Sequence, residues 1–444
     1  MLNQGICQST KFLVRLKREI AGQSPLALSQ WLLLLIPFTL VISKRLNVLV
    51  ILLYGASVVL QPELGKRCWQ VLKTRWVWAF WLFYGFHALS MAWSTEVNVA
   101  QFALERKASL LFIPLFIALD RKIDLDILRH SMLSLILSCC ISIWICLFLA
   151  LCNYLETGIP SFFFYHAFSW PLDELNAIYF SFFAFSSLVF SHFLIRVGYR
   201  LLLNDWCQFV IIFTLSTGLI LLSSRLFISL TLLFLLRLAI LNYAQLVSKK
   251  LRFGWIIVLP LFIGGVSFFS QTRDRFNQLL DSQFSVLQQD QFQYDTPFNG
   301  LTIRLLFWRF AGEIVEGERA FVLGLGIGDA QAAMNQTIVK HNVYHGNPNL
   351  GDHGYLGYNF HNQFVETWVQ LGIVGLLLWL LLLGLFIKKW DYKWSNPVIY
   401  FFLAVLTFSV IESILERQHG IVFFAFFLSI FQITSKYEVS PKPI

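Results

Sequence analysis

Long apolar segments alternate with short polar ones along most of the chain. An α-helix needs about 20 apolar residues to cross the hydrocarbon core of a bilayer. By this criterion we predict twelve membrane-spanning helices, at residues 26–42, 46–60, 76–93, 108–119, 131–152, 176–195, 206–222, 226–241, 253–270, 364–387, 398–415 and 420–435. The second and fourth segments are short, and Pro114 interrupts the fourth, so the number of spans needs an independent check.

The composition agrees with a protein that lies mostly in lipid. Hydrophobic residues make up 57% of the chain and charged residues only 13%, whereas a soluble domain has about 25% charged residues. The mean hydropathy is +0.65. These values exclude a soluble protein and predict an all-α integral membrane protein.

The distribution of Lys and Arg provides the check on the number of spans. Basic residues collect in cytoplasmic loops. With a cytoplasmic N-terminus, the cytoplasmic loops and tails contain 21 Lys and Arg, and the short loops on the other side contain 6. Twelve spans with cytoplasmic tails at residues 1–25 and 436–444 fit this bias. The net charge of +9 then follows from membrane topology, and we predict no nucleic-acid partner.

One loop is much longer than the others. Spans one to nine occupy residues 26–270, the long loop occupies residues 271–363, and spans ten to twelve occupy residues 364–435. The predicted orientation places this loop outside the cytoplasm. Loops of this length without a function are rare in compact domains, so we expect a folded loop domain. Within it we predict a helix at residues 302–317, which begins at Thr302 and ends at Gly317.

Three basic residues fall at the extracytoplasmic face in this topology. Arg225 lies in the turn between spans seven and eight, Arg304 opens the loop helix, and His361 ends the loop. Guanidinium groups bind phosphate through paired hydrogen bonds, and a neutral His accepts a proton from a hydroxyl. The set suits a lipid diphosphate and an alcohol acceptor. The alternatives are headgroup anchoring for Arg225, a surface charge for Arg304 and helix capping for His361.

Other residues near this face are further candidates. Arg106 and Lys107, at the outer end of the fourth span, either contact phosphate or anchor that span at the interface. Trp308 shares a helix face with Arg304, and Asn362 follows His361, so both are candidates for substrate binding.

We predict neither a metal nor a cofactor. The seven Cys lack metal-ligand spacing, and no Cys or carboxylate pattern supports a zinc site at His341, His345, His353 and His361. The GLGIG segment (324–328) is not a dinucleotide fingerprint, and we expect it to form a backbone turn that packs near the site.

The motifs LLSSRLF (221–227), RLLFWRFAGEIV (304–315) with the LGLGIGD turn after it, and HNQFVETWVQLGIVGLL (361–377) occur in this order. With them the chain resembles the O-antigen ligase family, which also contains O-antigen polymerases and protein O-oligosaccharyltransferases. The resemblance implies a GT-C-like, metal-independent inverting glycosyltransferase of lipopolysaccharide biosynthesis in the bacterial inner membrane. It implies transfer of a glycan from undecaprenyl diphosphate to a lipid A–core hydroxyl at the periplasmic face. The family's functional residues fall on Arg225, Arg304 and His361.

One segment departs from the family pattern. Residues 341–360 are long and rich in Asn, Gly and Tyr, which leaves the acceptor open. A polymerase of the same superfamily is the first alternative. A polytopic transporter is a more distant one, because the halves of the chain show no repeat and the informative polar residues cluster at one face.

Overall fold

The structure is a computed structural model that describes residues 28–173, 175–199, 205–240, 262–280, 284–347, 351–385 and 397–435. The two predicted cytoplasmic tails, at residues 1–25 and 436–444, lie outside the described residues. So does the first half of the predicted span 253–270.

The described residues form α-helices and short 3-10 helices, and contain no β-strand. The helices of the first half of the chain are α2 (Leu28–Ile42), α3 (Lys44–Val59), α4 (Leu64–Leu72), α5 (Arg75–Ser90), α6 (Val97–Lys107), α7 (Ser109–Leu119), α8 (Leu125–Thr157), α9 (Tyr165–Ser169) and α10 (Ala177–Arg196). Those of the second half are α11 (Asp205–Leu221), α12 (Arg225–Ile240), α14 (Ser270–Leu280), α15 (Thr302–Gly317), α16 (Ala330–Lys340), α17 (Gln363–Gly384), α18 (Pro397–Ile411) and α19 (Gln418–Thr434). The all-α prediction is therefore confirmed.

The predicted spans, apart from 253–270, each correspond to a helix, and α8 extends past the predicted 131–152 at both ends. Among the helices that the structure describes, three are long and apolar enough to cross a membrane, namely α8, α10 and α17. The pair α3 and α4, bent by 110°, is a fourth candidate. The protein is thus a multi-pass membrane protein. An 11-residue helix such as α7 is only about 16 Å long, so helix length does not establish twelve spans, and that number stays a prediction.

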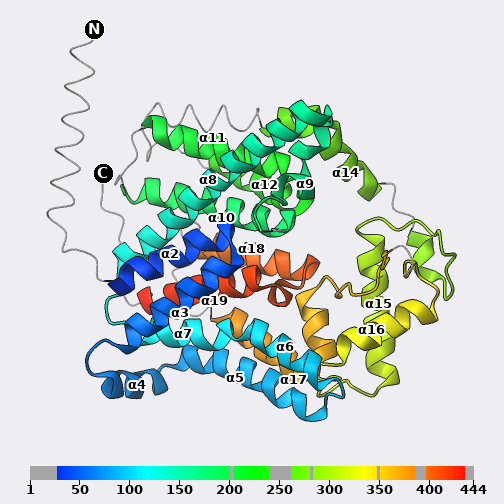
Figure 1. Cartoon of the computed structure of the whole chain (residues 1–444), viewed down its shortest axis with the longest axis horizontal. Coiled ribbons are helices and arrows are strands. Elements are labelled where there is room, and N and C mark those ends of the chain that lie inside the picture. Colours follow the sequence, from blue (N-terminus) through cyan, green and yellow to red (C-terminus); the bar gives the residue numbers. More distant parts are fainter. Residues whose placement is uncertain are drawn as a thin grey trace, which may run out of the picture.

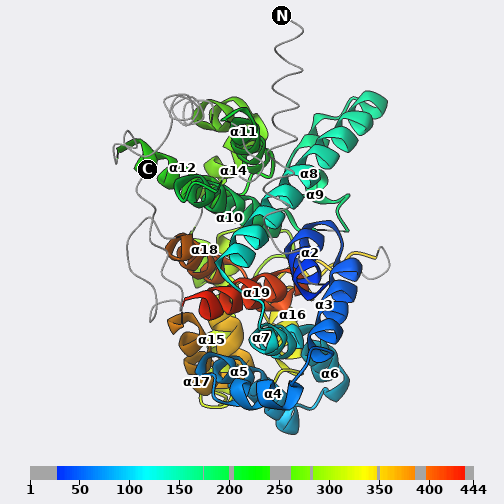
Figure 2. The same cartoon turned by 90° about the vertical axis from the view of Figure 1, so that its left-hand side faces the viewer.

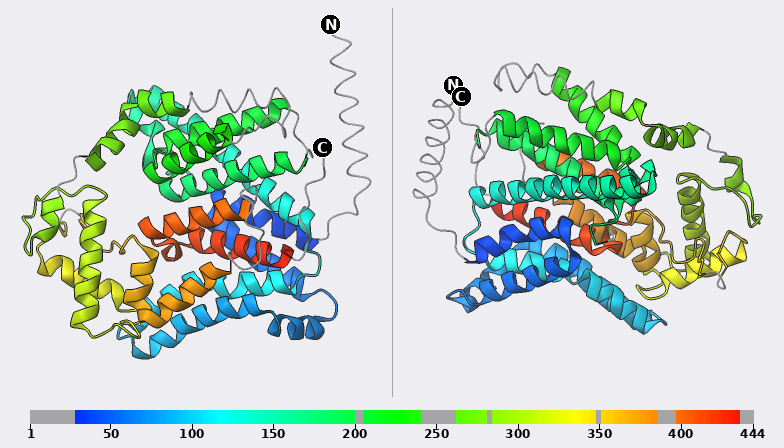
Figure 3. Two further views of the ribbon diagram at one scale, coloured as in Figure 1. Left: turned by 180° about the vertical axis from the view of Figure 1, so that it is seen from behind. Right: turned by 45° about the horizontal axis from the view of Figure 1, so that its top comes forward.

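The apolar helices lie roughly parallel, and α15 and α16 group together at one end of them (Figures 1 and 3). Helix α19 occupies the centre, between α10 and α7 (Figure 2), and almost all of its side chains are buried. Phenylalanines fill the space between α10 and α19, where the rings of Phe182 and Phe423 lie 4.8 Å apart. Such close aromatic contacts stabilise the packing of α10 against α19.

A second, smaller cluster of buried hydrophobic residues lies around α15 and α16. Helix α15 has the bounds predicted from its sequence, residues 302–317. Its buried side chains recur at helical spacing, at Ile303, Leu306, Phe307, Phe310 and Ile314. The region therefore has a core of its own among the described residues. Its position outside the cytoplasm and its status as a loop domain stay predictions.

Helix α17 is broken at Gly372, which has φ +63° and ψ −163°. The segment 321–326 lies against this break and satisfies the backbone groups that the break exposes. Four hydrogen bonds join the two, from Leu325 N–H to Val369 O, Gly326 N–H to Gln370 O, Ile373 N–H to Phe321 O and Val374 N–H to Val322 O. A non-helical segment is tolerated at membrane depth when protein surrounds it in this way.

The glycine-rich turn is a packing element. A Cβ on Gly324 would lie 2.4 Å from the backbone of Gln370, and one on Gly326 would lie 2.3 Å from Ser94 Oγ. The Asp329 carboxylate accepts hydrogen bonds from the N–H groups of Thr95 and Glu96, just before α6. The turn therefore ties α6 to α17 through close backbone contact, in agreement with the backbone turn expected for residues 324–328.

Candidate functional site

Arg225 and Arg304 come together around Gly300. Arg225 begins α12 after a tight turn in which Ser223 has φ +51°, and Arg304 lies in the first turn of α15. A Cβ on Gly300 would lie 3.0 Å from Nη2 of Arg225 and 3.2 Å from Nη1 of Arg304. Arg304 Nη1 also donates to the carbonyl oxygen of Gly300. Because guanidinium groups stay protonated in proteins, this pair concentrates positive charge at one point.

His361 pairs with a carboxylate from another part of the chain. Its Nδ1 atom lies 3.1 Å and 3.2 Å from the two carboxylate oxygens of Glu412. An ionised carboxylate only accepts hydrogen bonds, so Nδ1 carries the hydrogen. In a neutral His361 the lone pair is then on Nε2. Glu412 therefore fixes which ring nitrogen can take up a proton.

Glu412 also connects His361 to the arginine pair. Nη2 of Arg304 lies 3.7 Å from Glu412 Oε2, and Arg304 Nε donates to the carbonyl oxygen of Ile411 at 3.0 Å. Helix α18 ends at Ile411, so Glu412 lies outside that helix, although the predicted span ran to residue 415. Burial raises the pKa of Glu412, but His361, Arg304 and Arg417 outweigh burial and hold this pKa below its ordinary value.

Aromatic rings surround His361. Its ring is nearly parallel to Phe307, at 8° and 6.5 Å, and it meets Tyr358 edge to face at 5.8 Å. Phe307 is buried and Tyr358 is 44% exposed, and the His361 side chain itself is 20% exposed. His361 itself has φ +47°, which is uncommon for a residue with a side chain. Its N–H is held by Asn359 Oδ1 at 3.0 Å.

Trp308 and Asn362 contact the backbone on either side of His361. The Trp308 indole N–H donates to the carbonyl oxygen of Phe360 at 3.0 Å. Asn362 is the N-cap of α17, and its Oδ1 accepts from the N–H groups of Phe364 and Val365. Both contacts favour a role in holding His361, and the predicted substrate contacts of Trp308 and Asn362 stay hypotheses.

Arg106 and Lys107 contact another glutamate, Glu416, in the short segment between α18 and α19. Lys107 Nζ lies 2.6 Å from Glu416 Oε1, and this lysine side chain is fully buried. Arg106 Nη1 donates to the carbonyl oxygen of Glu416 at 3.0 Å and is 45% exposed. A buried, ion-paired lysine is better placed to hold Glu416 than to meet a diphosphate. The headgroup or substrate role of Arg106 stays open.

Sequence reasoning missed Glu412 and Glu416, which contact four of the candidate residues. A signal was available, because Glu412 falls inside the predicted span 398–415, and an ionisable residue within a span is a functional hypothesis by default. What the sequence could not supply was the partner of Glu412, since His361 lies 51 residues away.

The loop histidines have separate partners. His341 contacts the carbonyl oxygen of Asp290 and, at 2.7 Å, Glu313 Oε2. His345 contacts the carbonyl oxygen of Val343, and His361 pairs with Glu412. Within the described ranges, no three His, Cys, Asp or Glu residues gather as a metal site.

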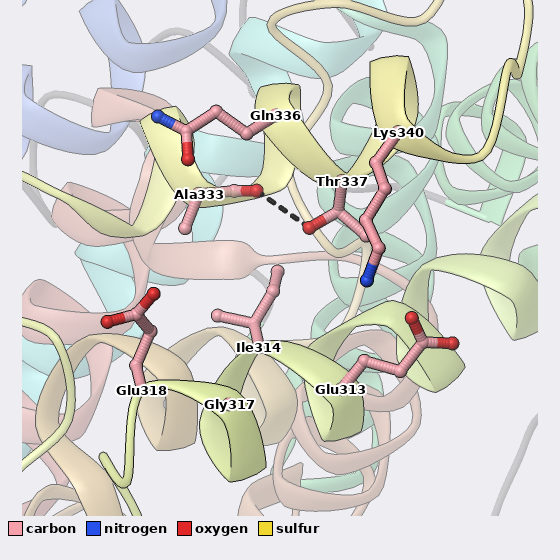
Figure 4. Close-up of a pocket in the computed structure, with 8 residues that line it drawn as sticks. All are labelled: Glu313, Ile314, Gly317, Glu318, Ala333, Gln336, Thr337 and Lys340. Atoms are coloured by element: carbon pink, nitrogen blue, oxygen red, sulfur yellow. Dashed lines mark hydrogen bonds between the residues drawn. The ribbon is translucent and has the colours of Figure 1, made fainter.

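A cavity of about 280 Å³ opens between α15 and α16 (Figure 4). Its charged lining residues are Glu313, Glu318 and Lys340. Neither Arg304 nor His361 lines it, so this cavity is separate from the Arg225–Arg304–His361 cluster.

The fold and these contacts define a multi-pass helical membrane protein in which two arginines and a Glu-paired histidine gather at one end of the helices. Residues 210–380 match the protein-family model for O-antigen ligase, so the resemblance predicted from the motifs is confirmed for this part of the chain. The match covers less than half of the chain and includes Arg225, Arg304 and His361. Comparison with curated proteins and with solved structures gives no match.

Proposed function

We propose that this protein is an O-antigen ligase, a membrane glycosyltransferase that moves O-antigen or a related polysaccharide from undecaprenyl diphosphate to a hydroxyl of lipid A–core. The observation that carries the proposal is the linked cluster of Arg225, Arg304 and the His361–Glu412 pair. Arg225, Arg304 and His361 lie inside the family-matched region, residues 210–380, and Glu412 lies after it.

The arginine pair would bind the diphosphate of the donor. Each guanidinium offers planar, paired donors that match phosphate oxygens. When the bond between the anomeric carbon and the diphosphate oxygen breaks, negative charge develops on that oxygen. Fixed positive groups at this point stabilise the departing diphosphate. This role needs no metal ion, and we propose a metal-independent reaction.

His361 would act on the acceptor. Its Nε2 takes the proton of the acceptor hydroxyl while the hydroxyl oxygen forms the new bond to the anomeric carbon. Glu412 orients the ring and stabilises the imidazolium that results, as a carboxylate does in other His-dependent sites. A single displacement from the face opposite the diphosphate inverts the anomeric configuration. The proton rests on His361 and the electron pair leaves with the diphosphate.

The proposed setting is the bacterial inner membrane. The twelve predicted spans place both termini in the cytoplasm and the residues of 271–363 in the periplasm. The donor's polyprenyl chain would remain among the helices, and its diphosphate would meet Arg225 and Arg304 at the periplasmic interface. The lipid A–core acceptor would meet the donor at this same face.

A deletion strain tests the proposal. We expect surface lipopolysaccharide to lose its long chains on gels while long glycan accumulates on undecaprenyl diphosphate. A core that carries a single repeat unit would instead identify a polymerase of the same superfamily. Transfer by purified protein, from lipid-linked glycan to lipid A–core, completes the test. An unaltered glycan profile in the deletion strain would contradict both functions.

A further inference from the structure

One oxygen of Glu366 bridges the two chain segments that carry His361 and Glu412. Glu366 lies in the first turn of α17 and is 4% exposed. Its Oε2 accepts a hydrogen bond from the Phe360 N–H at 3.1 Å and another from Ser413 Oγ–H at 3.1 Å. Phe360 directly precedes His361, and Ser413 directly follows Glu412. The distance between Phe360 and Ser413 therefore depends on a single carboxylate oxygen.

The same face of α17 holds the rest of the segment between α18 and α19. Gln363, Glu366 and Gln370 lie on one side of the helix, three and four residues apart. Gln363 Oε1 accepts from the Leu415 N–H at 2.7 Å. Gln370 Nε2 donates to Glu366 Oε1 at 2.8 Å and lies 3.1 Å from Glu416 Oε1. Three buried polar side chains thus bind three positions of one short segment.

Burying these polar side chains costs free energy, and a helix that only packed against its neighbours would avoid this cost. Taking a carboxylate and two amides out of water is unfavourable, and replacing such a network with apolar side chains is often neutral or stabilising. His361 also holds a left-handed backbone conformation, which persists only where its surroundings impose it. The network supplies that constraint directly next to His361.

We propose that Glu366 is a positioning residue for glycosyl transfer, which sets the His361–Glu412 contact by binding Phe360 and Ser413 with one oxygen. This inference rests on the proposed function of His361. Glu366 touches no reacting atom in this scheme. It acts by keeping His361 Nδ1 against Glu412, so that Nε2 points at the acceptor.

Three variants and a control test the inference in the purified full-length protein. Ser413→Ala removes one arm of the bridge, and Glu366→Leu removes both. Glu366→Gln keeps an oxygen that can accept from Phe360 and Ser413. Ser409→Ala is the matched control, because Ser409 is also buried, close in sequence, and its Oγ has no hydrogen-bond partner among the described residues.

We expect kcat for glycan transfer to fall about tenfold in Ser413→Ala and about a hundredfold in Glu366→Leu, since small displacements of a reacting group have effects of this size. The KM for the lipid-linked donor should stay unchanged, because Arg225 and Arg304 remain in place. Glu366→Gln should restore most of the activity, and Ser409→Ala should match the wild type. Wild-type kcat in folded Ser413→Ala would overturn the inference, and Ser413→Ala decides the matter alone if Glu366→Leu does not fold.

A second readout separates this inference from the proposed function. Diethyl pyrocarbonate modifies accessible imidazoles, and mass spectrometry reports the modification of His361. We expect faster modification of His361 in Ser413→Ala than in Ser409→Ala, whether or not the protein transfers glycan. If the wild type transfers no glycan but His361 is modified faster in Ser413→Ala than in Ser409→Ala, only the proposed function is contradicted. If the wild type is active but the two serine variants have equal modification rates and equal kcat, only the positioning role is contradicted.

Discussion

His361 Nδ1 lies 3.1 Å from Oε1 of Glu412, although 51 residues separate the two along the chain. The histidine directly precedes Asn362, the N-cap of α17, and the glutamate stands directly after α18. Packing of these two helices therefore creates the pair. The same glutamate lies 3.7 Å from Arg304, so the imidazole of His361 and the guanidinium of Arg304 share one partner.

The first prediction concerns this shared partner. Glu412→Gln keeps the size of the side chain but removes its charge, so the imidazolium formed during transfer loses its counter-ion. We expect kcat to fall about a hundredfold or more, with a small change in the donor KM. Steady-state transfer rates at several donor concentrations provide the measurement. A variant with unchanged kcat would remove Glu412 from the mechanism.

The second prediction separates charge from geometry in the arginine pair. Arg225→Lys and Arg304→Lys keep the positive charge but lose the planar, paired donors. We expect each to weaken donor use about tenfold, a loss of kcat/KM that corresponds to about 1.4 kcal/mol. Arg309→Lys is the control, because Arg309 is on the same helix but pairs with Glu313 and Asp290. Equal loss in Arg304→Lys and Arg309→Lys would point to damage of α15 and not to a lost contact with the donor.

The third prediction uses the glycine between the two arginines. Gly300→Ala places a Cβ 3.0 Å and 3.2 Å from the two guanidinium groups, so both must shift by a few tenths of an ångström. We expect a weaker donor interaction with little change in thermal stability. Gly312→Ala, within α15, meets nothing within 4 Å and should leave transfer unchanged. Isothermal titration with an undecaprenyl diphosphate analogue compares the two, and equal affinities would contradict the proposed diphosphate site.

Local pattern explains what could be predicted from the sequence. Apolar runs indicated most of the helices, and the terminal residues Thr302 and Gly317 indicated the bounds of α15, because both signals depend on neighbours in the chain. The end of α18 was predicted four residues too late, since Ile414 and Leu415 are apolar but lie in a 3-10 turn. The apolar composition of a segment indicated where a helix lies, but it did not give the length of that helix.

Contacts between distant segments explain what could not be predicted. The role of Gly324 and Gly326 depends on backbone that approaches from α17 and from the segment before α6. The pairing of Lys107 with Glu416 joins residues 309 positions apart. No spacing rule along the chain contains such information. Motif resemblance indicated Arg225, Arg304 and His361, but the residues that hold them became visible only in the folded chain.

The fourth prediction concerns the break in α17. Gly372→Ala requires a left-handed backbone at an alanine and places its Cβ 2.2 Å from the backbone of Val322. Strain of about 1–3 kcal/mol from the backbone alone adds to this clash, so we expect a marked loss of thermal stability or of folded protein. Gly384→Ala, at the C-terminal end of the same helix, meets nothing within 4 Å and should be tolerated. Fluorescence-detected size-exclusion chromatography after heating compares the variants, and equal stability would show that α17 can straighten.

The fifth prediction is a dependence of stability on pH that originates at Glu412. The folded protein holds the pKa of this carboxyl below its ordinary value, which is about 4.3 in an unfolded chain. A group of this kind stabilises the fold above its unfolded pKa, and the stabilisation is lost as pH falls through the lower, folded pKa. Glu412→Gln lacks the ionisable group, so its stability contains no such contribution.

We therefore expect the melting temperature of the wild type to exceed that of Glu412→Gln by the largest margin near neutral pH. The margin should shrink as the buffer becomes more acidic than the ordinary carboxyl pKa. Because both proteins share every other titrating group, the difference between their melting curves reports on Glu412 and the groups that it contacts. A margin that is constant from neutral to acidic pH would mean that Glu412 is not held in its ionised form by His361, Arg304 and Arg417.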